Sequence, residues 1–357
     1  MRFCKKCIMP ETFRGITFDE EGICNFCLGY ESNTSSLGKE KLIHELSSTD
    51  HTGEYDCVVP FSGGKDSAYI LYYVVKELDL NPIVVSYNSG YQSKIAEENV
   101  RNACDILGVE LLVVRSLGEI QRKLLHSNYL LSESTGGRWG VCGNCTAILR
   151  TVSINTAKKF NVPFIIWGSS TIESSDVKKH EKSKLGEVQR VGLKRWINYI
   201  AKLVNDGLKK PLSIYYATQY GLLSITQRIS LHFPLRHALN PISLPPYTME
   251  DPKFIHFYDY IHWASIKNVD LLKKELGWKH PEGKDSRFDC ELHCVGNIHH
   301  LRDFGISHDG LTFCKFIREG SMSREEAVIR EAEVVNSVQD ECKTLLENIN
   351  LKDREII

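Results

Sequence analysis

The stretch that decides the fold reads YDCVVPFSGGKDS and runs from residue 55 to residue 67. Its first half is a short apolar run that predicts a buried β-strand, and its end opens a helical pattern near 66–79. Between the two, Gly63 and Gly64 let the backbone approach an anion closely. Backbone N–H groups and the N-terminus of the helix would surround that anion, so the stretch predicts a phosphate-binding loop.

Side chains of the loop add to this prediction. Ser62, Lys65 and Ser67 offer further donors to a phosphate, although their spacing differs from the Walker pattern GxxxxGK[ST]. Asp66 begins the helix, where it could hold Mg²⁺ or cap the helix. A Gly-rich turn that only redirects the chain is the simpler interpretation, but the strand-loop-helix context favours a phosphate site.

Apolar runs of strand length alternate with helical stretches along the next hundred residues. The runs lie at 56–60, 81–87, 109–115 and 162–168, and the helical stretches lie near 66–79, 93–107 and 144–160. Such alternation indicates βαβ units and an α/β fold, with a parallel sheet covered by helices on both faces. Ligands of such folds bind at the carboxyl ends of the strands.

Three regions are expected: an N-terminal cysteine module and linker over 1–50, the loop-bearing α/β domain over 51–245, and a C-terminal helical region over 246–357. The α/β domain carries a basic insertion at 177–235, and its stretch 177–210 has ten Lys and Arg against three acidic residues. That stretch is either a solvated helical insertion or a basic flap over an anionic substrate.

Two helices are expected in the C-terminal region, near 253–276 and 323–349. In the second, Ser323 and Glu326 have the spacing of a capping box.

Composition narrows the function classes. The formal net charge of −1 offers no global basic field for a nucleic acid backbone, so a nucleic acid partner is disfavoured. No apolar run approaches the roughly 18 residues that span a membrane, and the start MRFCKKC lacks the apolar core of a signal peptide. A cytoplasmic protein is expected, in which the twelve cysteines act as metal ligands or thiols and not as structural disulfides.

The first cysteine cluster has the spacing of a zinc site. Cys4, Cys7, Cys24 and Cys27 form C-x2-C-x16-C-x2-C, which lies inside the range for a tetrahedral ion with four thiolates. A closed site of this type predicts structural Zn²⁺ that stabilises the module without catalysing. Free thiols and an iron centre are the alternatives.

The loop SGGKDS resembles the PP-loop of the N-type ATP pyrophosphatases, whose members cleave ATP between the α and β phosphates and pass AMP to a substrate oxygen. The resemblance implies Mg²⁺ and catalytic roles for Lys65, Asp66 and Ser67. It implies ATP-binding residues in the loop and after the second and fourth strands: Phe61, Ser62, Gly63, Gly64, Lys65, Asp66, Ser67, Ser86, Tyr87, Asn88, Gly168 and Ser169.

A second cysteine cluster stays open between three interpretations. The CxxC of Cys142 and Cys145 resembles the stretch of tRNA-thiolating PP-loop enzymes that holds a [4Fe–4S] cluster with one distant cysteine, here Cys290 or, as an alternative, Cys294. A second zinc site and no metal at all are the other two interpretations, because thiolates suit both metals. His293 between the two distant cysteines is a candidate proton carrier, whereas ordinary core or surface roles are expected for His299 and His300.

Over nearly its whole length, the chain resembles the N-acetyl sugar amidotransferases of bacterial surface-polysaccharide and pseudaminic and legionaminic acid pathways. The segments that carry this resemblance are FCKKCIMPET, GICNFC, FSGGKDS, KKELGWKHPEGKDSRFD and SMSREEA. The resemblance implies that ATP adenylates the acetamido oxygen of an N-acetylated sugar, and that ammonia then displaces AMP to leave an acetamidino group. A separate glutaminase would supply the ammonia, because no glutaminase domain is recognisable here. The alternatives are a tRNA thiolase with an iron–sulfur cluster and a non-catalytic nucleotide-sensing subunit.

Overall fold

The computed structural model describes residues 1–30, 37–48, 53–115, 142–168, 252–261, 267–281 and 288–348. Contacts within the chain define two units, one formed by residues 1–170 and 247–357 and the other by residues 171–246. All described residues belong to the first unit. The predicted basic insertion at 177–235 lies outside the described residues.

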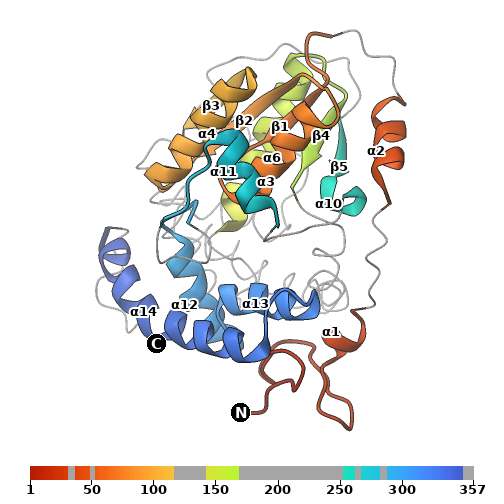
Figure 1. Ribbon diagram of the computed structural model, residues 1–357. Helices are drawn as coiled ribbons and strands as arrows, with labels where there is room; N and C mark the ends of the chain where they lie inside the picture. The colour runs from red at the N-terminus through yellow and green to blue at the C-terminus, as the bar shows by residue number, and fades with distance from the viewer. Residues whose placement is uncertain are drawn as a thin grey trace, which may run out of the picture. The chain divides into compact units, whose positions relative to one another are not determined.

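Five parallel strands form the sheet, in the order β3-β2-β1-β4-β5 (Figure 1). Their bounds are β1 Cys57–Pro60, β2 Pro82–Asn88, β3 Leu111–Arg115, β4 Phe164–Trp167 and β5 Lys253–His256. The parallel sheet and the four strands expected from the apolar runs are confirmed.

The sequence predicted a helix near 253–276, and its second half is confirmed, since α11 spans Lys267–Leu276. Its start is wrong, because a fifth strand lies there. Lys253–His256 instead pairs with Phe164–Trp167 along the edge of the sheet. Successive side chains of β5 point to opposite faces of the sheet: Ile255 is buried in the hydrophobic core on one face, and Phe254 packs against the core on the other face. The partner strand, more than 80 positions earlier in the chain, decides this structure, and no local pattern reveals it.

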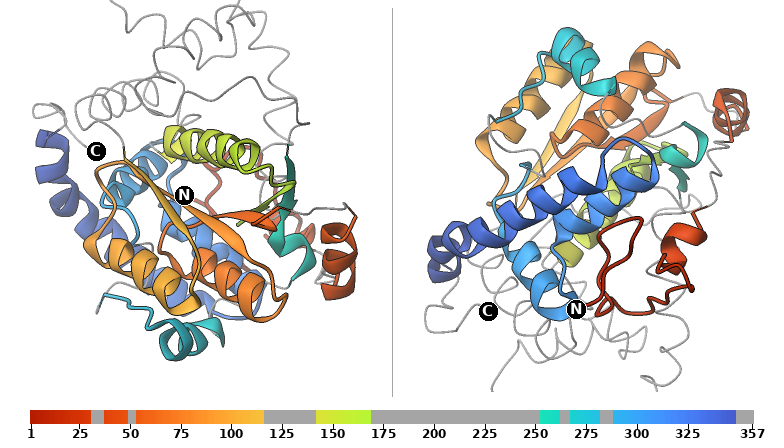
Figure 2. Two further views of the ribbon diagram at one scale, coloured as in Figure 1. Left: turned by 90° about the horizontal axis from the view of Figure 1, so that it is seen from above. Right: turned by 60° about the horizontal axis from the view of Figure 1, so that its bottom comes forward.

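Helices cover both faces of the sheet, as predicted (Figure 2). On one face lie α3 (Lys65–Lys76), α4 (Lys94–Leu107) and α11 (Lys267–Leu276), and on the other lies α6 (Cys142–Lys159). The strands alternate accordingly, so that Val59 faces the first group and Val58 faces α6. Helix α4 begins at Ser93, whose Oγ accepts from the N–H of Ala96 at 3.1 Å.

Further helices complete the described chain: α1 (Asn25–Leu28), α2 (Lys39–Leu46), α10 (Phe257–Tyr260), α12 (His293–Phe304), α13 (His308–Arg318) and α14 (Arg324–Asn348). The sequence analysis expected α14 but not α12 and α13. The Ser323 half of the capping box is confirmed, because its Oγ accepts from the N–H of Glu326 at 3.0 Å.

The N-terminal module and the C-terminal helices share one core. The four cysteines of the module pack with Ile306, Phe313, Cys314 and Ala327, which lie on or beside α13 and α14. Arg324 at the start of α14 donates from Nε to the carbonyl oxygens of Cys4 (3.4 Å) and Cys7 (3.2 Å). Regions at the two ends of the sequence therefore support one another.

Helices α12 and α14 are joined by a disulfide between Cys294 and Cys342. The expectation that no cysteines form a structural disulfide is therefore wrong for this pair. The two residues lie with their Cα atoms 5.7 Å apart in an apolar cluster with Leu292, Ile298 and Val338, so packing of the two helices brings them together.

Among the helices that the structure describes, none has the length and apolar character needed to cross a membrane.

Candidate functional site

The loop Ser62–Ser67 lies at the point where the strand order of the sheet reverses. It follows β1, which is flanked by β2 on one side and β4 on the other. From β1 the chain moves outward to β2 and β3, and it then returns to the other side of β1 for β4 and β5. In open α/β sheets, this reversal opens a crevice at the carboxyl ends of the strands, where ligands bind.

Gly63 shows why the loop requires glycine. Its φ is +87°, and a Cβ atom at this position would lie 2.3 Å from the backbone carbonyl oxygen of Ala96. Any side chain would therefore meet both an unfavourable backbone conformation and a clash with α4. The next residue, Gly64, is the N-cap of α3. Asp66 therefore lies in the first turn of α3, and the alternative in which it is the N-cap is wrong.

Two serines close the loop from within. The Oγ atoms of Ser62 and Ser67 are 3.2 Å apart, and the N–H of Ser62 donates to the Oγ of Ser67 at 3.3 Å. Ser67 in turn donates to the carbonyl oxygen of Gly64 at 3.0 Å. The loop is thus curled around the first turn of α3, as an anion site at a helix N-terminus requires.

Three residues outside the loop hold it in place. The carbonyl oxygen of Gly63 accepts from Trp278 Nε1 at 3.0 Å and from Asn99 Nδ2 at 3.2 Å. The carbonyl oxygen of Ser62 accepts from Gln92 Nε2 at 2.9 Å. Both carbonyl groups are therefore satisfied by side-chain donors, which fixes the backbone of the loop.

Charged groups surround the start of α3. Lys65 Nζ lies 3.5 Å from Asp66 Oδ1 and 5.6 Å from the centre of the Phe316 ring on α13. The carboxylate of Asp289 also approaches, since a Cβ atom on Gly64 would lie 3.5 Å from its Oδ2. The lysine can offset part of the charge of a polyphosphate, and the two carboxylates can hold a divalent cation beside it.

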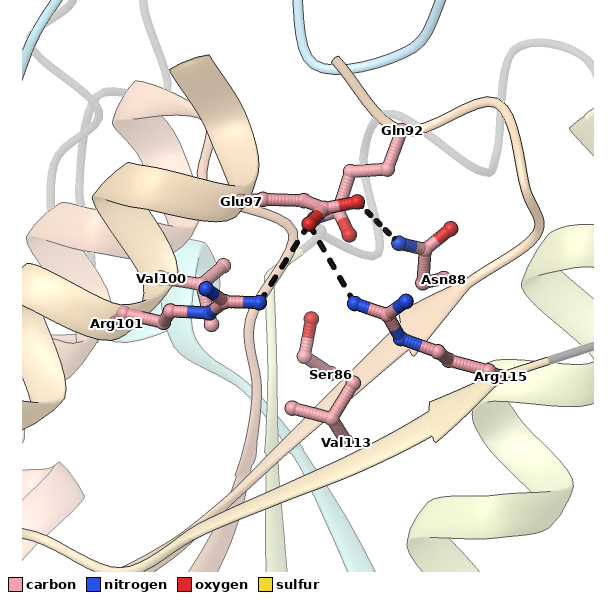
Figure 3. Close-up of a pocket in the computed structure, with 8 residues that line it drawn as sticks. All are labelled: Ser86, Asn88, Gln92, Glu97, Val100, Arg101, Val113 and Arg115. Carbon is pink, nitrogen blue, oxygen red and sulfur yellow. Dashed lines mark hydrogen bonds and ion pairs between the residues drawn. The ribbon is translucent and has the colours of Figure 1, made fainter. Parts of the chain in front are cut away.

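A pocket lies beyond the loop at the ends of β2 and β3 (Figure 3). Ser86 and Asn88, two of the residues expected after the second strand, are buried and line it. The carboxylate of Glu97 contacts three other residues that line the pocket (Figure 3). It accepts a hydrogen bond from Asn88 Nδ2 at 2.5 Å, and its Oε2 lies 3.5 Å from Arg115 Nη2 and 3.7 Å from Arg101 Nη2. These hydrogen bonds and ion pairs order the side chains around the pocket.

The other expected nucleotide residues have different positions. Phe61 is fully buried in the core, where it supports the loop from below, and Tyr87 is half-buried in β2 but does not line the pocket. Gly168 is exposed just after β4, and a Cβ atom there would lie 3.2 Å from Ile70 of α3. Ser169 lies outside the described residues.

The four N-terminal cysteines form a metal-binding group. Their sulfur atoms all lie within 4.8 Å of one another, with Cys7 and Cys24 at 3.8 Å and Cys4 and Cys27 at 4.0 Å. Two Zn–S bonds of about 2.3 Å at a tetrahedral angle place their sulfurs about 3.8 Å apart, so the geometry fits one zinc ion. A single iron ion bound by four thiolates has the same arrangement, so the geometry indicates one tetrahedral metal ion.

Neighbouring groups shift the pKa values of the thiols in this cluster in opposite directions. The N–H groups of Cys7 and Cys24 donate to Cys4 Sγ at 3.4 and 3.2 Å. Hydrogen bonds from Cys24 and Cys7 lower the pKa of Cys27 to about 2, and the positive charge of Arg318 contributes to the shift. Hydrogen bonds with Cys27 and Cys7, together with burial, raise the pKa of Cys24, and the pKa of Cys7 is raised as well. Metal binding needs deprotonated sulfur, so Cys27 is already in the ligand form, whereas Cys7 and Cys24 would each release a proton on binding.

The second cysteine cluster is only partly described. The backbone of Cys142 begins α6, but its side chain lies outside the described residues. Cys145 is half-buried on α6. The backbone of Cys290 forms an isolated antiparallel β-bridge with Gln92, whose side chain donates to the carbonyl oxygen of Ser62 in the loop. Cys294 is bonded to Cys342, which removes it as the alternative distant ligand. Of the two distant cysteines expected to join Cys142 and Cys145 at an iron–sulfur cluster, only Cys290 therefore remains, and it lies next to Gln92 beside the loop.

The residues that hold the loop were missed in the sequence analysis. Trp278 and Asp289 belong to the segment GWKHPEGKDSRFD, which was noted only for a resemblance, while Gln92 and Asn99 lie just before and within α4. Their types gave no signal, because amide and indole groups satisfy backbone carbonyls in many contexts. Only the approach of α4, Trp278 and Asp289 to the loop reveals their role.

Comparison with known proteins adds little. No family model matches the chain. The uncharacterized protein MJ1599 of Methanocaldococcus jannaschii is 31% identical over 117 residues, which is 31% of this chain and only 42% of that protein. A solved structure, the U34-tRNA thiolase NcsA from Methanococcus maripaludis with its [4Fe–4S] cluster, has 16% identity and a TM-score of 0.35, over 99% of this chain and 91% of NcsA. A score this low supports no inference, so the function rests on the residues of this chain.

Proposed function

We propose that this chain is an ATP-dependent enzyme that cleaves ATP between the α and β phosphates and transfers AMP to an oxygen atom of its substrate. The observation that carries the proposal is the curled Ser62–Ser67 loop at the reversal point of the sheet. Its glycines, its helix N-terminus and Lys65 converge where a pyrophosphate group would lie.

Each group in the loop has a role in this reaction. Lys65 and the N–H groups at the start of α3 would stabilise the charge that develops as the α–β bond breaks. Mg²⁺ binds through one or two carboxylates and the phosphates themselves, and Asp66 and Asp289 would supply those carboxylates. Ser62 and Ser67 would donate to phosphate oxygens.

For the recipient, we propose the acetamido oxygen of an N-acetylated sugar. An amide oxygen is a poor leaving group, and its adenylation allows ammonia to displace AMP and form an amidine. The segment GWKHPEGKDSRFD carries the sequence resemblance to sugar amidotransferases, and its Trp278 and Asp289 both contact or approach the loop. The ammonia would come from a separate glutaminase.

A second candidate is thiolation of a tRNA base. The observation that favours it is Cys290, which pairs with Gln92 next to the loop and would hold a [4Fe–4S] cluster together with Cys142 and Cys145. Such a cluster would supply a site for the sulfur nucleophile beside the nucleotide. The formal net charge of −1 gives no general attraction for a polyanion, which is why tRNA is the second candidate.

For the N-terminal cysteines, we propose a structural zinc ion. The 3.8 and 4.0 Å sulfur distances support a single tetrahedral ion. All four positions are occupied by thiolates, so the ion would have no place for substrate.

Release of pyrophosphate from ATP tests the proposal. Purified protein is incubated with ATP and Mg²⁺ plus either acetamido sugars, free and nucleotide-linked, with ammonium, or bulk tRNA with sulfide. We expect pyrophosphate and AMP to form in the sugar arm. Stimulation only by tRNA would replace the sugar with the second candidate, and no stimulation by either would remove both recipients.

Variants of one helix separate the loop chemistry from general effects. Lys65→Ala is expected to lower pyrophosphate release by about 10²–10³-fold, because it removes charge stabilisation at the breaking bond. Lys76→Ala, at the exposed opposite end of α3, is the matched control and should retain full turnover. Asp289→Asn should raise the Mg²⁺ concentration needed for half-maximal turnover, and undiminished turnover of Lys65→Ala would contradict the proposal.

A further inference from the structure

Helices α12 and α13 bring imidazole and carboxylate groups together at a place that the proposed ATP chemistry does not use. His293, Asn297 and His300 recur on one face of α12 at positions i, i+4 and i+7. His308 and Asp309, in the first turn of α13, contact that face. The ring centres of His293 and His308 are 5.5 Å apart, and those of His300 and His308 are 4.9 Å apart.

Three of these side chains have the arrangement of a ligand set. Ligand atoms of His293, His308 and Asp309 all lie within 4.8 Å of one another. At a tetrahedral angle, bonds of about 2.0–2.2 Å to one ion place two ligand atoms about 3.3–3.6 Å apart. A shift of less than about 1 Å in each side chain therefore closes the set around an ion.

The surroundings orient the carboxylate. Asp309 is buried, and its Oδ2 accepts from Asn297 Nδ2 at 2.9 Å. Its other oxygen, Oδ1, lies 2.7 Å from His293 Nε2. The backbone N–H of Asp309 also donates to Asn297 Oδ1 at 3.2 Å. One amide thus fixes the carboxylate from behind and leaves one oxygen facing the imidazoles, as outer partners do at metal sites.

The position of Asp309 is secured from a third helix. Ser307 is the N-cap of α13, and its Oγ accepts from the N–H of Gly310 at 2.7 Å. The N–H of Ser307 donates to Glu331 of α14 at 2.7 Å. The first turn of α13 is therefore held before any ion binds, which lowers the cost of ordering the ligands.

We propose that His293, His308 and Asp309 bind a divalent transition-metal ion that joins α12 to α13. Two imidazoles and one carboxylate are ligands that suit Zn²⁺ and Fe²⁺, whereas Mg²⁺ and Ca²⁺ prefer oxygen ligands alone. Three protein ligands leave a further coordination position, and His300 adjoins the site through its ring contact with His308. This site is separate from the four N-terminal cysteines and does not depend on the proposed ATP chemistry.

A hydrogen-bonded His–Asp pair is the simpler explanation, and it accounts for His293 and Asp309. It does not account for the convergence of His308 on the same point, nor for the amide that orients the second carboxylate oxygen. A +2 ion would balance the buried charge of Asp309 and use all three groups.

The site adjoins the nucleotide crevice through the backbone. The N–H of His293 donates to the carbonyl oxygen of Cys290 at 3.2 Å, and the N–H of Ser93 donates to the carbonyl oxygen of Asp289 at 3.2 Å. An ion at the start of α12 would therefore stabilise the segment that presents Asp289 to the loop.

Zinc stoichiometry tests the proposal on the full chain, purified without a histidine tag. The wild type, His308→Gln and Asp309→Asn are dialysed against the same Zn²⁺ buffer, and bound zinc is measured by mass spectrometry. We expect each variant to retain one equivalent fewer than the wild type. His44→Gln, an exposed histidine on α2, is the control and should retain the wild-type amount. Equal zinc in the wild type and both folded variants overturns the proposal.

Far-UV circular dichroism would reveal whether a variant fails to fold. In that case a spectroscopic measurement on the wild type alone tests the proposal. Co²⁺ bound by thiolates gives intense charge-transfer bands in the near ultraviolet, whereas Co²⁺ bound by imidazole and carboxylate gives only weak visible bands. We expect a class of bound Co²⁺ that adds visible absorption without charge transfer. If every bound Co²⁺ is accompanied by thiolate charge transfer, the site does not bind metal and the proposal fails.

Discussion

The loop Ser62–Ser67 and the four-cysteine cluster are both suited to binding an ion, but different forces hold them. The loop is six consecutive residues that follow a buried strand and include the first turn of α3, and its serines bond to one another. The segment that carries the cysteine cluster has one short helix, α1, within residues 1–30, and its backbone is held by Arg324, more than 300 positions away. The loop depends on the sheet beneath it, whereas the cysteine cluster depends on helices from the far end of the chain and on the metal ion proposed above.

The largest expected effect comes from removing a ligand of the cluster. Cys7→Ser removes one of the four ligands and should lose about one equivalent of zinc. The effect on folding should be large, because structural zinc contributes on the order of 10 kcal/mol of apparent binding free energy to folding. Amide hydrogen exchange should accelerate in α13 and α14, which share the core of the cluster, and stay unchanged in β1 and β2.

Cys104→Ser is the control for this experiment. Cys104 is a buried thiol on α4 whose pKa is raised to about 12 by burial, so it is protonated and outside the cluster. The variant should keep its zinc. Unchanged exchange in α13 for Cys7→Ser would show that the C-terminal helices do not depend on the metal, and the comparison would then fail.

An intermediate effect is expected from Gly63→Ala. A left-handed backbone costs about 1–2 kcal/mol for a residue with a Cβ atom, and the clash with Ala96 adds about 1–3 kcal/mol. The free energy of unfolding should fall by the sum, and pyrophosphate release should be lost because the loop must move.

Gly108→Ala separates these two contributions. Gly108 also has a positive φ, of +68°, but nothing lies within 4 Å of its added Cβ atom. Chemical denaturation of this variant should show the backbone cost alone, with normal turnover. Equal losses of stability in the two variants would mean that the contact between the loop and α4 is unimportant.

The smallest of the three effects is expected from Trp278→Phe. This change removes the hydrogen bond to the carbonyl oxygen of Gly63 and should cost about 1–2 kcal/mol, measured by denaturation, with about a tenfold fall in kcat/KM for ATP. Lys279→Ala, which breaks an exposed ion pair with Glu98, should change stability by less than about 0.5 kcal/mol. A Trp278→Phe protein with wild-type kinetics would show that the loop holds its shape from local bonds alone.

Local sequence patterns predicted the central part of the fold well. Strands β1 to β4 and the helices α3, α4 and α6 follow from apolar runs and helical stretches, because buried strands and amphipathic helices leave a periodic record in the sequence. Strand β5 was predicted as a helix, and α12 and α13 were not predicted. These elements depend on partners elsewhere in the chain: β5 on β4, and α12 and α13 on each other and on α14.

The candidate site shows the same division. Ser62, Lys65 and Ser67 could be predicted because contiguous loop residues between a strand and a helix occupy one place by necessity. Asn99, Trp278 and Asp289 could not, since each reaches the loop from another segment. The pairing of Cys294 with Cys342 was likewise hidden, and it removed one of the two distant cysteines considered for a cluster.

By itself the sequence determined the parallel sheet, the glycine loop between β1 and α3 and the four-cysteine cluster, because each depends on residues within one short stretch or on a fixed spacing. The tertiary structure decided which groups support the loop, which cysteines are paired and how His293, His308 and Asp309 meet. The physical reason is range: backbone geometry acts over a few residues, whereas packing and hydrogen bonds join any segments that the fold brings within a few ångströms.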